Sequence, residues 1–160
     1  MKCLILAAGY ATRLYPLTEN FPKPLLKVGE KTILDWLVDD VSPVIDEFIV
    51  VSNHKFAHHF EAWAATKPQP ITVVDDGTST NETRLGAVKD IALGLQNNED
   101  DVLVMAGDNV LDFSLLLSLI HILSLLADGK IDYISVREKI RLSPFAVNDP
   151  SGEIEKMIED

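Results

Sequence analysis

Two cations, Arg13 and Lys23, lie in a long stretch that has neither helical nor strand periodicity and that follows the apolar run of residues 3–8. A loop of this length inside a compact domain is usually functional or disordered. Three prolines stiffen it, and four leucines could anchor it to the core: Leu14, Leu17, Leu25 and Leu26. We therefore expect a rigid loop at the carboxyl end of a buried strand, which presents backbone N–H groups and two positive charges to an anion.

A carboxylate in a second segment could bind a metal. Residues 102–106 form an apolar run that leads into Gly107, Asp108 and Asn109. An Asp-Asn pair after a strand is often only a turn. The same carboxylate could hold a hard cation, because Mg²⁺ is usually bound by one or two carboxylates together with the phosphates of a substrate. The local sequence leaves both interpretations of Asp108 open.

A third candidate is the polar segment 76–87, which contains Asn81, Arg84 and Gly86. It runs into an amphipathic pattern over residues 82–95. The structural interpretation is a polar loop in which Asn81 caps the helix and Gly86 permits close packing. Arg84 could contact a phosphate or be solvated, and we favour a solvated side chain.

Apolar runs alternate with helical patterns along the chain, which predicts an α/β protein with a doubly wound, mostly parallel sheet. The expected strands are residues 2–8, 48–51, 71–74, 102–106 and 131–136, and the expected helices are residues 31–41, 55–65, 82–95 and 114–126. Thr32 is a possible cap of the first helix. Ligands of such sheets bind beyond the carboxyl ends of the strands. The three candidate segments follow the first, third and fourth strands, so we expect them to meet at that edge.

Composition limits the classes of partner. The 160 residues fit one domain, 1–160, and the net charge of −11 is spread along the chain. This argues against a nucleic acid or an anionic membrane as partner, although a few local cations and a metal suffice for a nucleotide. The single cysteine, Cys3, excludes an internal disulfide. We see no signal peptide and no apolar stretch near the roughly 20 residues that span a bilayer, so we expect a cytoplasmic protein.

The opening loop resembles the signature of the sugar-phosphate nucleotidyltransferases, the nucleotide-sugar pyrophosphorylases, which include glucose-1-phosphate thymidylyltransferases. That signature runs roughly L-A-x-G-x-G-T-R-L-x-P-x-T-x-x-x-P-K-x-L. The residues of this chain that fit it are Leu6, Ala7, Gly9, Thr12, Arg13, Leu14, Pro16, Thr18, Pro22, Lys23 and Leu25. Ala11 stands where the second glycine is usual. The sequence has neither a P-loop nor a dinucleotide-binding glycine pattern.

The resemblance implies a Rossmann-like nucleotidyltransferase fold and a Mg²⁺-dependent transfer from a nucleoside triphosphate to a sugar 1-phosphate, which gives an NDP-sugar and pyrophosphate. It implies two catalytic residues, Arg13 at the β- and γ-phosphates and Lys23 near the α-phosphate and the incoming phosphate. Asp108 would be the Mg²⁺ ligand. Asn81 and Gly86 have the spacing of the glutamine and glycine that read the base in this family. The nucleotide-binding residues implied are Leu6, Ala7, Ala8, Gly9, Asn81 and Gly86.

The chain departs from the family in length. Such proteins usually have some hundreds of residues, and their later half holds the sugar pocket and an F-x-E-K-P motif whose lysine binds the sugar phosphate. Residues 149–160 resemble the strand before that motif, but the sequence stops at Asp160, and Lys156 is out of register. We expect the acceptor-binding half to be largely absent, so that the chain is a fragment, a natural short form, or one that another chain completes.

Two alternative functions stay open. One is a cytidylyltransferase that acts on a phosphorylated alcohol such as phosphocholine, and the other is a truncated, non-catalytic paralogue or subunit that binds nucleotide. Residues 114–126 are apolar on nearly every side, and the expected strand 154–158 would end without a cover. Exposed apolar surface and open strand edges favour association, so we expect a homo-oligomer.

Overall fold

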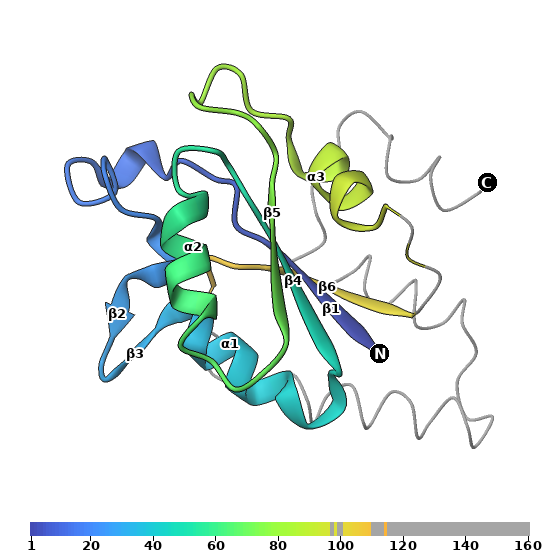
Figure 1. Cartoon of the computed structure of the whole chain (residues 1–160). Helices are drawn as coiled ribbons and strands as arrows, with labels where there is room; N and C mark the ends of the chain where they lie inside the picture. Colours follow the sequence, from blue (N-terminus) through green and yellow to red (C-terminus); the bar gives the residue numbers. More distant parts are fainter. Residues whose placement is uncertain (97, 99–100, 110–113, 115–160) are drawn as a thin grey trace, which may run out of the picture. The chain divides into compact units, whose positions relative to one another are not determined.

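Four parallel strands form the central sheet of the computed structural model, which describes residues 1–96, 98, 101–109 and 114 (Figure 1). The strands are β1 (Lys2–Leu6), β4 (Glu47–Ser52), β5 (Ile71–Asp75) and β6 (Val102–Ala106), and their order is β5-β4-β1-β6. In the central strand β1, Leu6 lies opposite Val51 on one side and Ala106 on the other. The chain steps outward from β1 to β5 and then returns to the free side of β1. This order confirms the predicted doubly wound, Rossmann-like arrangement.

Short elements and helices connect these strands. They are η1 (Thr12–Leu14), η2 (Lys23–Leu25), the antiparallel pair β2 (Lys27–Val28) and β3 (Lys31–Thr32), α1 (Ile33–Val41), η3 (Ser42–Val44), α2 (Ala57–Ala64) and α3 (Ala87–Gly94). Figure 1 shows α1 and α2 on one face of the sheet and α3 on the other. Because both faces are covered, the interiors of the two central strands, Cys3–Leu6 of β1 and Phe48–Val51 of β4, are apolar.

The interior residues of the two central strands, β1 and β4, form the centre of the core. Leu4, Ile49 and Val51 form a buried cluster against which Ile91 of α3 packs. Cys3 is fully buried, and burial raises the pKa of its thiol to about 12. A thiol with so high a pKa is an inert core group, in line with the apolar strand in which it lies.

Helix α1 begins at a side-chain cap. The hydroxyl of Thr32 accepts from the backbone N–H of Asp35, and the Asp35 carboxylate accepts from the backbone N–H of Thr32, both at 3.0 Å. This reciprocal capping box fixes the start of α1 at Ile33, two residues after the predicted start, and confirms Thr32 as the cap. The predicted start of the helix over residues 82–95 is wrong, because α3 begins at Ala87. Gly86, the residue before α3, has a φ of 90°, which lies outside the helical region. The helix therefore cannot extend back to residue 82, and Asn81 is not its cap.

The elements expected at 114–126, 131–136 and 154–158 lie outside the described residues, apart from Ser114 itself. For the same reason, the prediction of one domain over 1–160 stays a prediction. All the elements described above belong to one compact unit, Met1–Phe113. Within the part of the chain that the structure describes, every helix is too short or too polar to cross a membrane.

Candidate functional site

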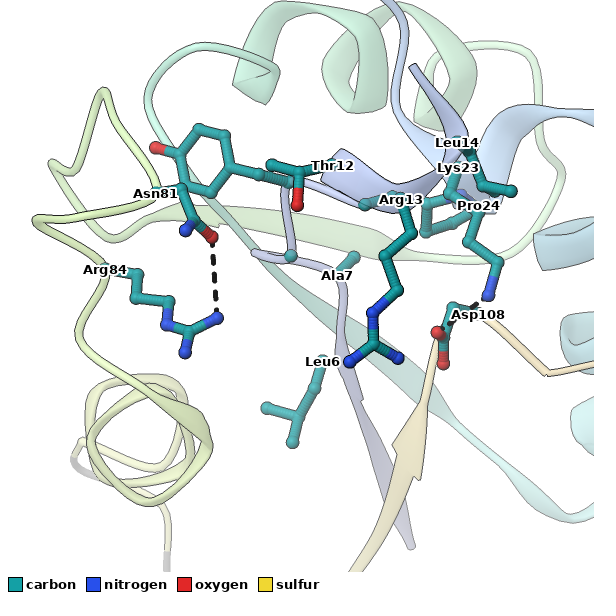
Figure 2. A pocket seen from close by; sticks show the side chains of 13 residues that line it. Leu6, Ala7, Thr12, Arg13, Leu14, Lys23, Pro24, Asn81, Arg84 and Asp108 are labelled. Atoms are coloured by element: carbon teal, nitrogen blue, oxygen red, sulfur yellow. Dashed lines mark hydrogen bonds and ion pairs between the residues drawn. The ribbon is translucent and has the colours of Figure 1, made fainter. Parts of the chain in front are cut away.

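A cleft of about 660 Å³ lies at the carboxyl edge of the sheet, where the opening loop, the end of β6 and the segment after β5 meet (Figure 2). The residues that line it are Leu6, Ala7, Gly9, Tyr10, Ala11, Thr12, Arg13, Leu14, Lys23, Pro24, Asn81, Arg84 and Asp108. The three segments that the sequence singled out therefore converge as expected. Among the candidate site residues, Ala8 and Gly86 do not line this cleft.

Arg13 is presented by the short turn η1. The residue before this turn, Ala11, has left-handed backbone angles (φ 47°, ψ 41°). A side chain with a Cβ adopts this conformation at a cost of about 1–2 kcal/mol, which gives a physical reason for the glycine of the signature at this position. The hydroxyl of the fully buried Thr18 donates to the carbonyl of Ala11 at 2.8 Å and holds the turn. The Arg13 side chain itself is exposed.

The leucines of the opening loop only partly anchor it. Leu14 and Leu17 are 42% and 61% exposed, so the prediction that they hold the loop to the core is wrong. Leu25 is buried as expected, and Leu26 is half-buried. Thr18 supplies an anchor that the sequence analysis missed, since a buried hydroxyl needs the hydrogen-bond partner that it finds here. In a loop without periodicity, residue type alone does not show which side chains face inward.

Lys23 and Asp108 meet inside the cleft. Lys23 is the first residue of η2 and lies between two buried prolines, Pro22 and Pro24. Its Nζ is 2.9 Å from Oδ2 of Asp108, and the two side chains are 29% and 51% exposed. Figure 2 shows the Arg13 guanidinium beside this pair. The predicted catalytic cations and the predicted metal ligand thus lie next to one another.

The end of β6 lies close to the backbone of β1, which explains why a glycine, Gly107, precedes Asp108. The backbone N–H of Gly107 donates to the carbonyl of Leu6 at 2.9 Å. A Cβ on Gly107 would lie 3.0 Å from that same oxygen, a contact tighter than side chains normally make. Glycine therefore lets β6 stay in register with β1 up to its last residue, and the next residue, Asp108, reaches the cleft.

The carboxyl end of β1 contributes backbone and small side chains. Leu6, Ala7 and Gly9 line the cleft, whereas Ala8 is buried. The Ala8 carbonyl accepts from Nδ2 of the fully buried Asn53 at 2.9 Å. Asn53 was not among the residues predicted from the sequence. The signal was present, because this polar residue directly follows an apolar strand.

The segment after β5 forms another wall. The Tyr10 hydroxyl donates to the carbonyl of Thr78 at 2.9 Å, which ties the opening loop to this segment. Asn81 and Arg84 both line the cleft, and Nη1 of Arg84 is 3.4 Å from Oδ1 of Asn81. Arg84, for which we favoured solvation over a phosphate contact, is exposed and also lines the cleft. Tyr10 was also missed, although an aromatic residue next to Gly9 could have suggested it.

Charge in the cleft favours an anion. Three cations (Arg13, Lys23 and Arg84) and one carboxylate (Asp108) line it, in a chain whose net charge is −11. The local field is therefore opposite in sign to that of the whole chain. The described residues contain no group of three or more side chains that could hold a metal unaided. One carboxylate still fits Mg²⁺ that arrives with phosphates, because substrate oxygens and waters complete its shell.

A doubly wound parallel sheet with a cationic cleft at its carboxyl edge defines the class of protein, a Rossmann-like α/β domain. The chain belongs to the nucleotidyl transferase family, since the model of that family matches residues 2–140. This membership confirms the resemblance seen in the opening loop.

Relatives with known names show the range of the family. The chain is 27% identical over 171 residues to mannose-1-phosphate guanylyltransferase 1 of Arabidopsis thaliana, a match that covers 99% of this chain and 45% of that protein. It is 49% identical over 55 residues to choline-phosphate cytidylyltransferase of Streptococcus pneumoniae, which covers 34% of this chain and 24% of that protein. The chain spans less than half the length of these two relatives.

A solved structure supports the fold. The structure of a UDP-glucose pyrophosphorylase complexed with UDP-glucose matches with a TM-score of 0.61 and 20% identity, over 76% of this chain and 52% of that chain. At this level of identity the match concerns the fold alone. It confirms the predicted nucleotidyltransferase fold.

Proposed function

We propose that the chain is the nucleotide-binding and catalytic part of a Mg²⁺-dependent nucleotidyltransferase that acts on a sugar 1-phosphate and gives an NDP-sugar and pyrophosphate. The observation that carries this proposal is the convergence of Arg13, Lys23 and Asp108 on one cleft at the carboxyl edge of the sheet. Membership of the nucleotidyl transferase family supports the type of reaction. The guanylyltransferase that matches along 99% of this chain supports a sugar phosphate as acceptor.

In the proposed reaction, a phosphate oxygen of the acceptor forms a bond to the α-phosphorus of the triphosphate. The bond from that phosphorus to the bridging oxygen breaks, and pyrophosphate leaves with the electron pair. The attacking oxygen is already anionic, so the main obstacle is the repulsion between two anions. Catalysis then consists of positioning and charge neutralisation.

The cations of the cleft fit these two tasks. Arg13 would bind the β- and γ-phosphates, and Lys23 would neutralise charge at the α-phosphate and the incoming phosphate. Mg²⁺ held by Asp108 would supply further neutralisation between phosphates. Because the prolines beside Lys23 are buried, the backbone that carries this lysine is set before the substrate arrives. Such preorganisation is what electrostatic catalysis requires.

The nucleoside would lie against the end of β1. Leu6, Ala7 and Gly9 line the cleft there, and their backbone could approach a ribose or a phosphate closely. Ala8 and Gly86 do not line the cleft, so in this proposal they act through the backbone that they shape. Asn81 would meet the base, because its amide offers both a donor and an acceptor.

A phosphorylated alcohol is the second candidate acceptor. The observation that favours it is the similarity to the choline-phosphate cytidylyltransferase, 49% identity over 55 residues. The non-catalytic alternative, a paralogue or subunit that binds nucleotide without turnover, predicts binding of the triphosphate and no pyrophosphate. Self-association and a cytoplasmic location also stay predictions, and the apolar segment 114–126 on which self-association depends lies almost entirely outside the described residues.

Pyrophosphate release tests the proposal. The four nucleoside triphosphates are each combined with a panel of sugar 1-phosphates and with phosphocholine, in Mg²⁺, and pyrophosphate is measured. We expect one acceptor class to give turnover that Lys23→Ala lowers about 10²-fold or more, the scale for loss of one charge-stabilising donor. Lys27→Ala is the matched control, because Lys27 is exposed and does not line the cleft.

Other results of the pyrophosphate assay distinguish the alternative functions and the roles of the two cations. Nucleotide binding without pyrophosphate from any acceptor would favour the non-catalytic alternative. Equal turnover in Lys23→Ala and wild type would remove Lys23 from the mechanism. Arg13→Ala is expected mainly to weaken triphosphate binding, which separates its role from that of Lys23.

A further inference from the structure

One cation of the cleft, Arg84, lies apart from the residues proposed to bind phosphates. Figure 2 shows Arg84 and Asn81 on one side of the cleft and Lys23 and Asp108 on the other, with Arg13 nearer to the latter pair. A triphosphate bound by Arg13 and Lys23 therefore leaves the Arg84 side for the nucleobase.

Arg84 follows a turn that fixes its backbone. The backbone N–H and the hydroxyl of Thr83 both donate to the carbonyl of Thr80, at 3.2 and 3.1 Å. Further upstream, the Thr78 carbonyl accepts from the Tyr10 hydroxyl and from the backbone N–H of His54. Arg84 makes no ion pair with a carboxylate among the residues that the structure describes. Hydrogen bonds thus hold the segment that carries Arg84, and the N–H groups that do not contact Asn81 are open to a ligand.

The Arg84–Asn81 pair presents hydrogen-bond donors. Nη1 of Arg84 donates to Oδ1 of Asn81 at 3.4 Å, which uses one of the two lone pairs of that oxygen. The guanidinium has five N–H donors and no acceptor, and the Asn81 amide keeps its two N–H donors. A complementary ligand must therefore offer acceptors on the edge that meets Arg84.

The nucleobases differ on this point. Guanine offers two adjacent acceptors, O6 and N7, and uracil and thymine offer carbonyl oxygens. Adenine carries an amino donor beside its N7 acceptor, and that donor would face the donors of Arg84. A fork of two parallel N–H groups on O6 and N7 of guanine is the commonest specific contact that arginine makes with a base.

We propose that Arg84 is a specificity-determining residue that recognises the nucleobase and selects a base with a carbonyl oxygen, guanine foremost, over adenine. This inference rests on the proposed function, because it takes the direction of the bound triphosphate from Arg13 and Lys23. It assigns to Arg84 a contact with the base, and the phosphate contacts stay with the two other cations.

Calorimetric titration of the full chain with Mg²⁺–GTP and Mg²⁺–ATP tests the inference. We expect wild type to bind GTP about tenfold or more tightly than ATP, the scale of one bidentate contact, and Arg84→Ala to lose most of that ratio. Arg84→Lys should not restore it, because lysine keeps the charge but lacks the planar fork. Lys89→Ala is the control for charge, since Lys89 is exposed on α3 and does not line the cleft.

Mg²⁺–tripolyphosphate, which has no base, completes the experiment. Its affinity is expected to be unchanged in Arg84→Ala and weakened in Arg13→Ala. Equal weakening of GTP, ATP and tripolyphosphate in Arg84→Ala, with rescue by Arg84→Lys, would place Arg84 at the phosphates and overturn the inference while the proposed function stands. Failure of wild type to bind any of the three ligands would overturn both.

Discussion

Lys23 and Asp108, which are 85 residues apart in the sequence, form a 2.9 Å ion pair inside the cleft. Both side chains are partly exposed, so the pair contributes little to folding. Its importance is chemical, because it joins the cation proposed to act on the α-phosphate to the carboxylate proposed to hold Mg²⁺. A metal ion at Asp108 would replace Lys23 as the partner of the carboxylate and leave the lysine free to bind a phosphate.

This relationship predicts an uncommon phenotype for Asp108→Asn. Without Mg²⁺, the variant should bind a nucleoside triphosphate as tightly as wild type or more tightly, because a negative charge has gone and Lys23 is released. With Mg²⁺, the gain in affinity that wild type shows should be lost. Calorimetry with and without the metal measures both effects, and unfolding in urea should differ by less than about 1 kcal/mol. If Mg²⁺ raises the triphosphate affinity of Asp108→Asn as much as that of wild type, Asp108 is a turn residue and not a metal ligand.

Ala11→Gly should stabilise the protein. The left-handed backbone at Ala11 costs about 1–2 kcal/mol for a residue with a Cβ, whereas the greater freedom of glycine in the unfolded chain costs about 0.5–1 kcal/mol. The expected net gain is about 0.5–1 kcal/mol in the free energy of unfolding, measured by urea denaturation. Ala62→Gly is a control at an exposed site within α2, where glycine should destabilise by about 1 kcal/mol. Destabilisation by Ala11→Gly would show that the turn carries no such strain.

Asp90 in α3 is a buried carboxyl group whose charge opposes folding. It is 6% exposed, and one of its oxygens, like one of Asp76, has no hydrogen-bond partner among the described residues. Burial, and then the charge of Asp76, raise the pKa of Asp90 from 3.8 to about 6. The folded state therefore holds a proton more tightly than the unfolded state, and the contribution of Asp90 to stability falls as the pH rises from about 4 to about 6.

Asp90→Asn should consequently stabilise the protein above pH 6, by about 2–3 kcal/mol at 1.36 kcal/mol per pKa unit. The difference between variant and wild type should shrink toward zero as the pH falls to about 4. Urea denaturation of both proteins at a series of pH values measures it. A difference that does not change with pH would show that the carboxyl group titrates normally in the folded protein.

Asp35 makes the opposite contribution. Burial disfavours its charge, but hydrogen bonds from Lys67, Trp63 and Thr32 outweigh that effect and lower its pKa to about 2. Its stabilisation is complete above about pH 4 and is lost as the pH falls toward 2. Asp35→Asn should therefore cost about 2 kcal/mol at pH 7 and much less near pH 2. Thermal denaturation across this pH range measures the loss of stability, with Asp39→Asn as a control at an exposed site of the same helix. A loss in Asp35→Asn that is the same at pH 2 as at pH 7 would contradict this account.

The sheet, and the proximity of the loops at its carboxyl edge, were predictable because they follow from the hydrophobic pattern of the strands and from the topology of a parallel sheet. Apolar runs define the parallel strands, and parallel strands bring their carboxyl ends to one edge, so Arg13 and Asp108 were expected to lie near each other. The start of α3 was not predictable from periodicity, because the amphipathic pattern continues back through Leu85 while Gly86 interrupts the backbone. The direction of Arg84 was also beyond the sequence, since it depends on the turn before it and on the Tyr10–Thr78 contact.

Binding of Mg²⁺–nucleoside triphosphate to the cleft is the central claim, and one calorimetric titration tests it most directly. The wild-type chain, the double variant Arg13→Ala/Lys23→Ala and the control double variant Lys27→Ala/Lys89→Ala are titrated with each of the four triphosphates in Mg²⁺. We predict one site per chain in wild type and in the control, for at least one triphosphate, and loss of that site in the cleft variant. Equal binding by the cleft variant and wild type, or no binding of any triphosphate by wild type, would contradict the account.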